Sequence, residues 1–397
     1  MKWEEKVRKV VPYVPGEQPN RPGMIKLNTN ECPYPPAPGV ETVMREFDYE
    51  KLRLYPDTQA TALVEALAEY YGVKKEQVFV GVGSDDVLAM SFLTFFNSDK
   101  PVLFPDITYS FYDVWAELFK IPYKVIPLNE EFHIVAEDYK AENGGVIFPS
   151  PNAPTGVFEN METIEEIIKA NQDVVVIVDE AYIDFGGESA LPLLEKYENL
   201  LVVQTFSKSR AMAGSRIGFA IGNEKLISYL NDAKFSFNSY TMDSLTIQLG
   251  AAAVKDVTYF KETVNKVIRT REWTKKELEK LGFSFQDSQS NFIFAKHNEK
   301  KAEDIKVLDI SQVSVLADYF IIANGTNKNQ VQALVDNVQE QLHKAGYESK
   351  QVEGYQTGNW ILLDYGDVII HIFSKEDRLF YDLERIWRDG KEITFEE

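Results

Sequence analysis

Cysteine and histidine are scarce in this chain of 397 residues, which has one cysteine, Cys32, and four histidines. A single cysteine can form neither an internal disulfide nor a cysteine-based metal cluster, and this fits a reducing cytoplasm. The histidines are scattered, which argues against a histidine metal site. We therefore expect a cytoplasmic protein without a metal centre.

Long apolar runs are absent from the sequence, and basic residues are outnumbered by acidic ones. No stretch of about 18 apolar residues exists, so no membrane span is expected. The charged start, Met1–Lys6, is not followed by the apolar core of a secretory signal. The formal net charge is −20. Because sequence-independent nucleic-acid binding needs cations for the phosphates, no direct nucleic-acid binding is expected.

Alternating strand and helix signals run from about residue 77 to residue 206. The runs Val174–Val178 and Leu200–Val203 are continuously apolar, as in strands that are covered on both faces. Such alternation predicts an α/β fold with a mostly parallel sheet and helices on both faces. Ligands of such sheets bind at the carboxyl ends of the strands.

Residues that can take part in chemistry follow these strands. Lys208 comes shortly after the run that ends at Val203, and a lysine amine can form a Schiff base with an aldehyde. Arg216 lies among small residues nearby and can hold a phosphate. An aldehyde that carries a phosphate is pyridoxal phosphate. Taken alone, this segment fits an ordinary loop equally well.

Three other segments strengthen this interpretation. Asp179 ends a buried strand, where a carboxylate needs a cation or donor such as a protonated pyridine nitrogen. A proline-stiffened turn presents the amide of Asn152, and glycines precede Ser84 and Asp85 at a predicted helix start, which is typical of an anion site. A strand-end aspartate is often only a helix cap, and a glycine-rich turn is often only a turn, but their joint order points to this cofactor.

The set resembles the fold-type I pyridoxal-phosphate (PLP) aminotransferases, and within them the histidinol-phosphate aminotransferase family. The resemblance covers about residues 1–300 and includes the motifs Lys26–Pro33, Tyr55–Asp57, Phe104–Tyr109 and Ser290–Phe294. It implies transamination of histidinol phosphate with 2-oxoglutarate by a homodimer with shared sites. Two departures lie at the phosphate loop, where this chain has Val82 and Asp86 and the family usually has Asn and Glu.

The resemblance also assigns roles. Lys208 would be the catalytic residue, which holds the cofactor and moves a proton. Asp179 would contact the ring nitrogen of the cofactor, Tyr182 and Asn152 its ring hydroxyl, and Tyr109 its ring face. The phosphate would be bound by Ser84, Asp85, Ser207, Arg216 and, from the other subunit, Tyr55. Tyr13 and Asn30 would line the substrate pocket. Without the resemblance, Tyr13 could simply hold the arm to the surface, and Tyr55 could be a core aromatic.

After Lys296 the family continues with a helix and strands whose arginines clamp the substrate's phosphate or carboxylate, and no such strand follows here. Instead the pattern predicts strands at 302–310 and 317–326, a helix at 328–345 and a hairpin at 360–373. This part resembles the ribosomal silencing factor family (RsfS, Iojap-like) from about residue 299 to the end. Its motifs include Val352–Tyr355, Leu363–Asp367 and Tyr381–Arg385.

That second resemblance implies binding rather than catalysis. The family docks on a protein at the intersubunit face of the large ribosomal subunit and blocks subunit joining. We predict Trp360, Asp364, Tyr365 and Asp367 as contacts, although Trp360 could equally be a buried hairpin aromatic. His371, between apolar strand neighbours, is interpreted as a structural histidine.

The predicted division is an N-terminal arm (1–35), an aminotransferase large domain (36–250), a partial small domain (251–298) and a silencing-factor domain (299–397). No flexible linker separates the halves, so recombination, gene fusion or sequence assembly could each have produced the junction. The predicted function is a fusion of an aminotransferase weakened by the missing arginines and a translation repressor. The alternatives are a silencing factor with an inactive PLP-fold appendage, or an aminotransferase of other specificity with a structural tail.

Overall fold

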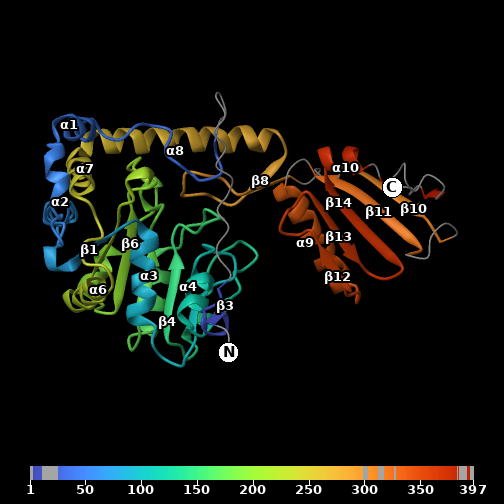
Figure 1. Cartoon of the computed structure of the whole chain (residues 1–397), viewed down its shortest axis with the longest axis horizontal. Helices are drawn as coiled ribbons and strands as arrows, with labels where there is room; N and C mark the ends of the chain where they lie inside the picture. The colour runs from blue at the N-terminus through green and yellow to red at the C-terminus, as the bar shows by residue number, and fades with distance from the viewer. Residues whose placement is uncertain are drawn as a thin grey trace. The chain divides into compact units, whose positions relative to one another are not determined.

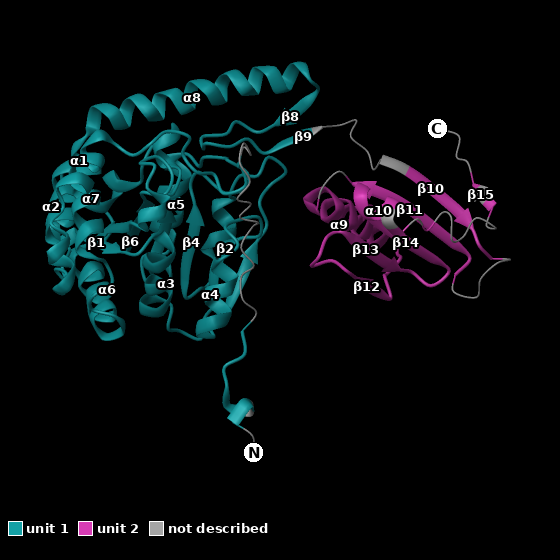
Figure 2. Cartoon of the chain, turned by 45° about the horizontal axis from the view of Figure 1, so that its top comes forward, with its two compact units in different colours: residues 1–296 teal, residues 297–397 magenta. Residues whose placement is uncertain are grey.

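A computed structural model describes residues 3–10, 26–297, 303–311, 317–325, 328–381, 383 and 391–393. The chain divides into two compact units, Met1–Lys296 and His297–Glu397, which Figure 2 shows in different colours. Each unit has its own sheet and its own buried apolar clusters. Among the described residues, no helix has the length and apolar character that crossing a bilayer requires.

The first unit is built on a seven-stranded sheet in the order β1-β7-β6-β5-β4-β2-β3 (Figure 1). Its strands are β1 Val78–Gly81, β2 Val102–Pro105, β3 Tyr123–Ile126, β4 Gly145–Pro149, β5 Val176–Asp179, β6 Leu200–Thr205 and β7 Gly218–Gly222. Neighbouring strands are parallel except at β7, which runs antiparallel to β1 and β6. The predicted mostly parallel sheet is confirmed, and the antiparallel strand β7 is an addition to it.

Helices cover both faces of this sheet. They are α1 Pro38–Glu46, α2 Thr61–Tyr71, α3 Ser84–Phe95, α4 Tyr112–Phe119, α5 Met161–Ala170, α6 Glu224–Phe237, α7 Ser244–Lys255 and α8 Val257–Lys280. Side chains of α3, α4 and α6 share one buried cluster with one face of the sheet. Those of α2, α5 and α7 pack on the opposite face. Burial on both sides explains the continuous apolar strand sequences.

Short 3₁₀ segments connect these elements. They are η1 Trp3–Lys6, η2 Tyr49–Arg53, η3 Lys75–Gln77, η4 Ala136–Lys140, η5 Ile183–Phe185, η6 Leu191–Glu195 and η7 Ala213–Ser215. After α8, a two-stranded sheet pairs β8 Phe283–Phe285 with β9 Ala295–His297. Phe260 and Val264 of α8 pack in one cluster with Tyr182 and Phe185, and this contact ties the helix to the end of β5.

The second unit has a six-stranded sheet in the order β12-β13-β14-β11-β10-β15. Its elements are β10 Glu303–Asp309, β11 Tyr319–Gly325, α9 Lys328–Lys344, β12 Gln351–Glu353, β13 Trp360–Asp364, β14 Val368–Ser374, α10 Lys375–Tyr381 and β15 Lys391–Ile393. The predicted hairpin is the antiparallel pair β13–β14, whereas β11 and β14 are parallel. Val331 and Val335 of α9 pack against one face of the sheet, as the helical spacing predicts.

Candidate active site

A cavity of about 230 Å³ lies at the carboxyl ends of β4, β5 and β6. Eight of the predicted site residues line it together: Ser84, Asp85, Tyr109, Asp179, Tyr182, Ser207, Lys208 and Arg216. Thr29, Glu31, Pro149, Ala153, Ala181, Thr205 and Ala213 complete the lining. Segments far apart in sequence therefore meet where the topology of a doubly wound sheet predicts a ligand.

Asp179, the last residue of β5, is buried at the floor of this cavity. Its carboxylate accepts hydrogen bonds from the Tyr112 hydroxyl (2.9 Å) and from the Ala181 N–H (3.2 Å). Burial raises the pKa of Asp179 to about 6, although these two bonds lower it. A buried carboxylate with so little compensation favours a cationic or N–H partner in the cavity. Tyr112 carried no sequence signal that distinguished it from a core aromatic of α4.

Lys208 follows β6 and reaches the same space. Its Nζ donates to the backbone oxygen of Thr29 (2.9 Å) and lies 5.5 Å from the centre of the Tyr182 ring. Burial lowers the pKa of the Lys208 ammonium, against the raising effects of Asp85 and Glu31. A lowered lysine pKa increases the share of the nucleophilic free amine. The hydroxyl of Tyr182 accepts a hydrogen bond from Asn30 Nδ2 (3.1 Å), so Asn30 lies behind Tyr182 and does not line the cavity.

Arg216 and the start of α3 form the opposite end of the cavity. Arg216 Nη2 lies 2.8 Å from a carboxylate oxygen of Asp85, whose other oxygen accepts from the Tyr109 hydroxyl (2.8 Å). A Cβ at Gly218 would lie 2.2 Å from the backbone of Gly83 and of Ser84. Only glycine therefore permits β7 to approach the N-terminus of α3 so closely. The helix N-terminus and a neighbouring guanidinium together form a site suited to an anion.

Other predicted residues lie outside the cavity. Asn152 is buried beside it, and its Nδ2 donates to Ile107 O (2.9 Å) and Thr155 Oγ1 (3.1 Å), so both N–H groups already have partners. The Oδ1 of the same amide is buried and has no hydrogen-bond partner among the described residues, so Asn152 keeps one free polar atom beside the cavity. Tyr55 is 81% exposed and packs on Tyr240 at 4.5 Å between ring centres. Tyr13 lies outside the described residues.

Glu180, next to Asp179, is a second buried carboxylate at the end of β5. It accepts hydrogen bonds from Ser189 Oγ (2.7 Å), Ala190 N (2.6 Å) and Gln204 Nε2 (2.7 Å). Burial raises its pKa to about 7, although these bonds lower it. With three donors, Glu180 is a structural residue that anchors the loop after β5 rather than a ligand of the cavity. No group of acidic, histidine or cysteine residues suited to a metal ion occurs in the part of the chain that the structure describes.

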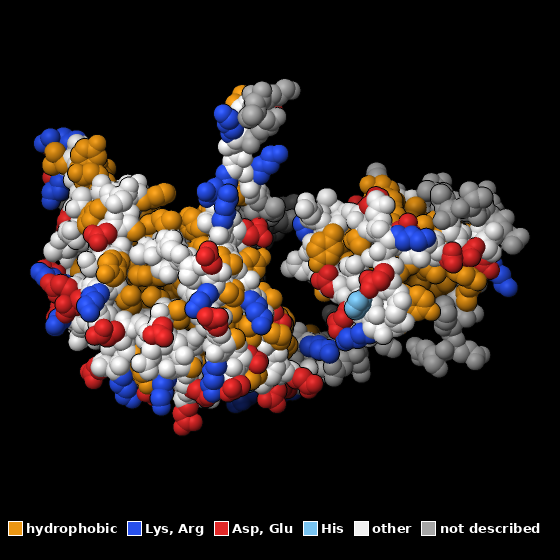
Figure 3. Space-filling model, turned by 90° about the horizontal axis from the view of Figure 1, so that it is seen from below, with side chains coloured by type: hydrophobic (Ala, Val, Ile, Leu, Met, Phe, Trp, Pro, Cys, Tyr) orange, Lys and Arg blue, Asp and Glu red, His pale blue; other side chains and the backbone are white. Residues whose placement is uncertain are grey.

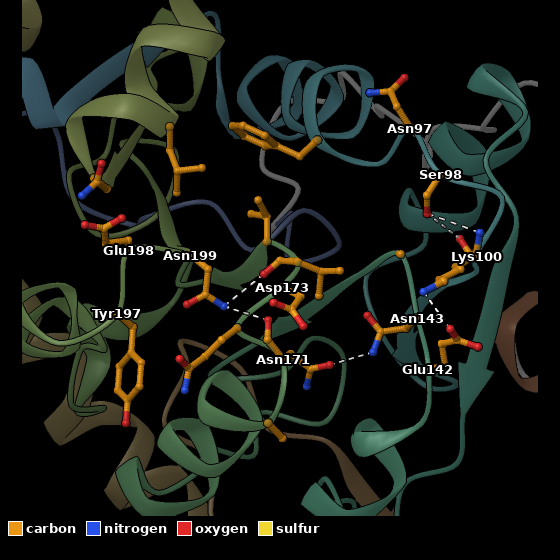
Figure 4. Close-up of a pocket in the computed structure, with 18 of the residues that line it drawn as sticks. Asn97, Ser98, Lys100, Glu142, Asn143, Asn171, Asp173, Tyr197, Glu198 and Asn199 are labelled. Carbon is orange, nitrogen blue, oxygen red and sulfur yellow. Dashed lines mark hydrogen bonds and ion pairs between the residues drawn. The ribbon is translucent and has the colours of Figure 1, made fainter.

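A larger hollow of about 1150 Å³ lies at the opposite, amino-terminal edge of the sheet, and its polar side chains mostly satisfy one another (Figure 4). Asn143 Nδ2 donates to Asn171 Oδ1 (2.7 Å), Asn199 Nδ2 donates to Asn171 O (2.9 Å), and Lys100 pairs with Glu142 (2.7 Å). From this side, acidic and basic side chains are interspersed over the larger unit (Figure 3). The hollow therefore lacks the convergent, uncompensated groups of the smaller cavity.

In the second unit, the predicted contact residues do not form a single patch. Trp360 packs in the cluster on one face of the sheet, donates from Nε1 to His371 Nδ1 (3.2 Å) and stacks on Phe373. Tyr365 packs with α9 on the other face. Asp364 accepts from the Gly366 N–H (2.7 Å) and thereby stabilises the β13–β14 turn. Burial lowers the pKa of His371 to about 4, in keeping with a structural histidine.

Comparison with known proteins identifies the class. The family model "Aminotransferase class I and II" matches residues 22–337, and the chain belongs to this family. It is 50% identical over 336 residues to a histidinol-phosphate aminotransferase of Lactococcus lactis subsp. cremoris, which covers 83% of this chain and 94% of the relative. It is 51% identical over 318 residues to histidinol-phosphate aminotransferase 1 of Hydrogenovibrio crunogenus, covering 80% and 89%. Within the class, the chain is thus a member of the histidinol-phosphate aminotransferase family.

Solved structures show the same fold. The histidinol-phosphate aminotransferase of Sinorhizobium meliloti, in complex with pyridoxal-5'-phosphate, has a TM-score of 0.62 at 22% identity and covers 68% of this chain and 75% of that chain. That of Clostridium acetobutylicum also has a TM-score of 0.62, at 21% identity, and covers 73% and 91%.

A second family model, "Ribosomal silencing factor during starvation", matches residues 286–397. The chain therefore joins an aminotransferase part to a silencing-factor part. The two matches overlap at residues 286–337. The aminotransferase match therefore ends at residue 337, later than the end at about residue 300 that the sequence motifs suggested. This shared stretch contains no arginine.

Proposed function

We propose that the first unit binds pyridoxal phosphate and catalyses transamination, and that the second unit binds the large ribosomal subunit. The observation that carries the enzymatic half is the meeting of Lys208, Asp179 and Arg216 around one cavity. These are an amine with a lowered pKa, a buried carboxylate and a guanidinium beside a helix N-terminus. Each suits one part of the cofactor: the aldehyde, the ring nitrogen and the phosphate.

The chain's own residues would divide the work as follows. The bound cofactor supplies an electron sink. Asp179 would hold a proton on the ring nitrogen, and that cationic partner would offset the desolvation of the buried carboxylate. Lys208 binds the cofactor's aldehyde and, once released by the amino substrate, carries a proton at Nζ. Tyr182 offers its hydroxyl to the ring oxygen, and Tyr109 packs on the ring face.

For the phosphate we propose Arg216, Ser207 and the backbone N–H groups of Ser84 and Asp85 as ligands. Arg216 already pairs with Asp85 (2.8 Å), so an entering phosphate would share or replace that carboxylate. We also propose that the chain forms a homodimer in which the exposed Tyr55 reaches the partner's phosphate site. Its high exposure and its absence from the cavity of its own chain support this assignment.

We propose histidinol phosphate and 2-oxoglutarate as the substrates, used slowly, with Tyr13 and Asn30 in the substrate pocket. The reason for slow turnover lies in the shared stretch 286–337, which provides none of the clamping arginines that the family resemblance implies. An anionic substrate would then lack its charged partners and bind weakly. The junction itself we place near residue 298, with the arm (1–35), large domain (36–250) and partial small domain (251–298) before it and the silencing-factor domain (299–397) after it.

The test of the enzymatic half is spectroscopic. Purified protein loaded with pyridoxal phosphate should show a visible band that borohydride abolishes while it leaves the cofactor covalently attached, and Lys208→Ala should show neither the band nor the attachment. Lys234→Ala is a suitable comparison because Lys234 is also buried but donates to the backbone oxygens of Thr58 and Val80 and does not line the cavity. A band that survives in Lys208→Ala would contradict the assignment. Turnover of histidinol phosphate at rates ordinary for a complete aminotransferase would contradict the proposed loss of the clamp.

For the second unit we propose docking on a basic protein of the large ribosomal subunit, which would repress translation by blocking subunit joining. Residues 299–397 carry 19 acidic and 11 basic side chains, a net charge of −8, and charge complementarity of this kind speeds association and weakens with salt. The test is co-sedimentation with ribosomes. Asp367→Lys should weaken it, whereas Asp336→Lys on α9 is a charge-matched control; equal binding by both would contradict this contact surface.

Two alternatives remain distinguishable by the same assays. A silencing factor with an inactive appendage would sediment with ribosomes but show no cofactor band. An aminotransferase with a structural tail would show the band but not sediment. The meeting of Lys208, Asp179 and Arg216 in one cavity favours a working cofactor site over an inactive appendage.

A further inference from the structure

We infer that Asn291, in the stretch retained after α8, is a positioning residue for the cofactor site: through Asn30 it fixes the direction in which Tyr182 offers its hydroxyl beside Lys208. This inference rests on the proposed function and deepens it. It assigns a task in the enzyme to the partial small domain.

The connection consists of contacts between four residues. Asn291 Nδ2 donates to the backbone oxygen of Asn30 (2.9 Å), and Asn30 Nδ2 donates to the Tyr182 hydroxyl (3.1 Å). The Tyr182 ring lies 5.5 Å from Lys208 Nζ. Asn30 has φ +54°, a left-handed conformation that asparagine tolerates better than most non-glycine residues, and the bond from Asn291 to its backbone oxygen restrains it there.

The second bond sets the orientation of the phenol. Because Asn30 donates to the Tyr182 oxygen, the phenolic hydrogen must point away from Asn30. Tyr182 also lines the cavity with Lys208, so its hydrogen is available to a ligand there. Burial raises the pKa of Tyr182 to about 12, so the hydroxyl stays protonated and remains a donor at neutral pH.

Anchoring alone does not account for Asn291. Arg271 Nη1 already bonds to Ser290 O (2.9 Å), and the N–H of Gln289 bonds to Gly156 O (2.8 Å), so the segment is held without Asn291. The Oδ1 of Asn291 is buried and has no hydrogen-bond partner in the described part of the chain. An amide that leaves one of its polar atoms unsatisfied costs stability. Asparagine at this position is therefore explained by the bond that it donates to Asn30.

The junction between the two units follows Asn291 closely in the chain. Asn291 precedes the change of compact unit at residue 297 by only a few residues. The chain thus retains the part of the small domain that reaches the cofactor site. What it lacks is an arginine in the following stretch, up to residue 337.

The test is a pH titration of the visible band of the loaded protein, in wild type, Asn291→Leu, Tyr182→Phe and the double variant. A hydrogen bond donated to the cofactor's ring oxygen stabilises its charged form, so loss of the donor should raise the titration midpoint. We expect each single variant to raise the midpoint by about 0.5 pH units or more. Because both act through one hydroxyl, the double variant should match Tyr182→Phe alone.

Two further variants complete the design. Asn30→Gly, which is free of strain at φ +54° and lacks the amide, should give the same shift even if Asn291→Leu folds poorly. Gln289→Ala, whose backbone bond to Gly156 remains, should leave the midpoint unchanged. An unchanged midpoint in Asn291→Leu and Asn30→Gly, or fully additive shifts in the double variant, would overturn the inference while leaving the proposed function intact. If the wild-type protein shows no visible band that borohydride removes, both the inference and the proposed function are overturned.

Discussion

Replacing Asp179 by asparagine should stabilise the cofactor-free protein at pH 8 and at the same time weaken cofactor binding. Asp179 is buried, with one hydroxyl and one backbone N–H as hydrogen-bond donors. Asparagine keeps the shape, and its one acceptor oxygen can still accept from the Tyr112 hydroxyl at the cost of the bond from the Ala181 N–H. It carries no charge that must be desolvated. On the proposed cofactor role, the ring nitrogen would lose its anionic partner.

The magnitude follows from the pKa of Asp179, which rises from 3.8 to about 6 on folding. A shift of about 2 units corresponds to about 3 kcal/mol. Between these pKa values the folded state binds more protons than the unfolded state, so the penalty is fully present above pH 6 and absent below 3.8. After allowing about 1 kcal/mol for the lost bond from the Ala181 N–H, we expect Asp179→Asn to gain about 2 kcal/mol at pH 8 and almost nothing at pH 4, where the protonated carboxyl also has only one free acceptor oxygen.

Urea denaturation of the cofactor-free wild type and of Asp179→Asn, at pH 8 and pH 4, measures this difference. Asp173→Asn is the control, because Asp173 is exposed just before the other end of β5. Fluorescence titration with pyridoxal phosphate should show weaker binding for Asp179→Asn only. The reasoning is refuted if Asp179→Asn is no more stable than wild type at pH 8, or if its gain is independent of pH.

Three further outcomes are expected. Gly218→Ala should prevent cofactor loading and lower thermal stability, because its Cβ would collide with the backbone at the start of α3; normal loading would contradict the close approach. Arg271→Met should lower the free energy of unfolding by about 2–5 kcal/mol, since it leaves two buried carbonyl oxygens without their donor, and a loss below 1 kcal/mol in a urea titration would argue against these bonds. His371→Leu should remove an acid-dependent instability of the second unit: with a folded pKa of about 4 against 6.5, wild-type stability should fall by about 3 kcal/mol from pH 6.5 to pH 4, whereas the variant should lack this contribution.

Local sequence patterns were sufficient to place Asp179 and Lys208. Each follows a continuous apolar run, and in a parallel sheet the residues after such runs must meet at one edge. β7 was not predicted because Gly218–Gly222 is short and contains two glycines, so its apolar pattern is weak. Its position between β1 and β6 depends in part on pairing with β1, which lies far earlier in the chain.

Long-range geometry explains what sequence reasoning missed in the site. Tyr112 lies 67 residues before Asp179 on an apolar helix, where nothing distinguishes it from its aromatic neighbours. Asn291 and Asn30 are separated by 261 residues, and their bond has no local signature. The opposite faces of Trp360 and Tyr365, by contrast, follow from strand alternation that continues one residue beyond β13, since an odd spacing reverses the side.

The close approach of Gly83 and Gly218 makes the Arg216 end of the cavity a meeting point of two backbone segments that are 135 positions apart. A ligand that binds both segments would hold β1 and β7, the first and the last strand of this sheet in chain order, together. Ligand binding should therefore slow deuterium uptake both in the peptide that contains Gly83 and in the peptide that contains Gly218, although only the second contains Arg216.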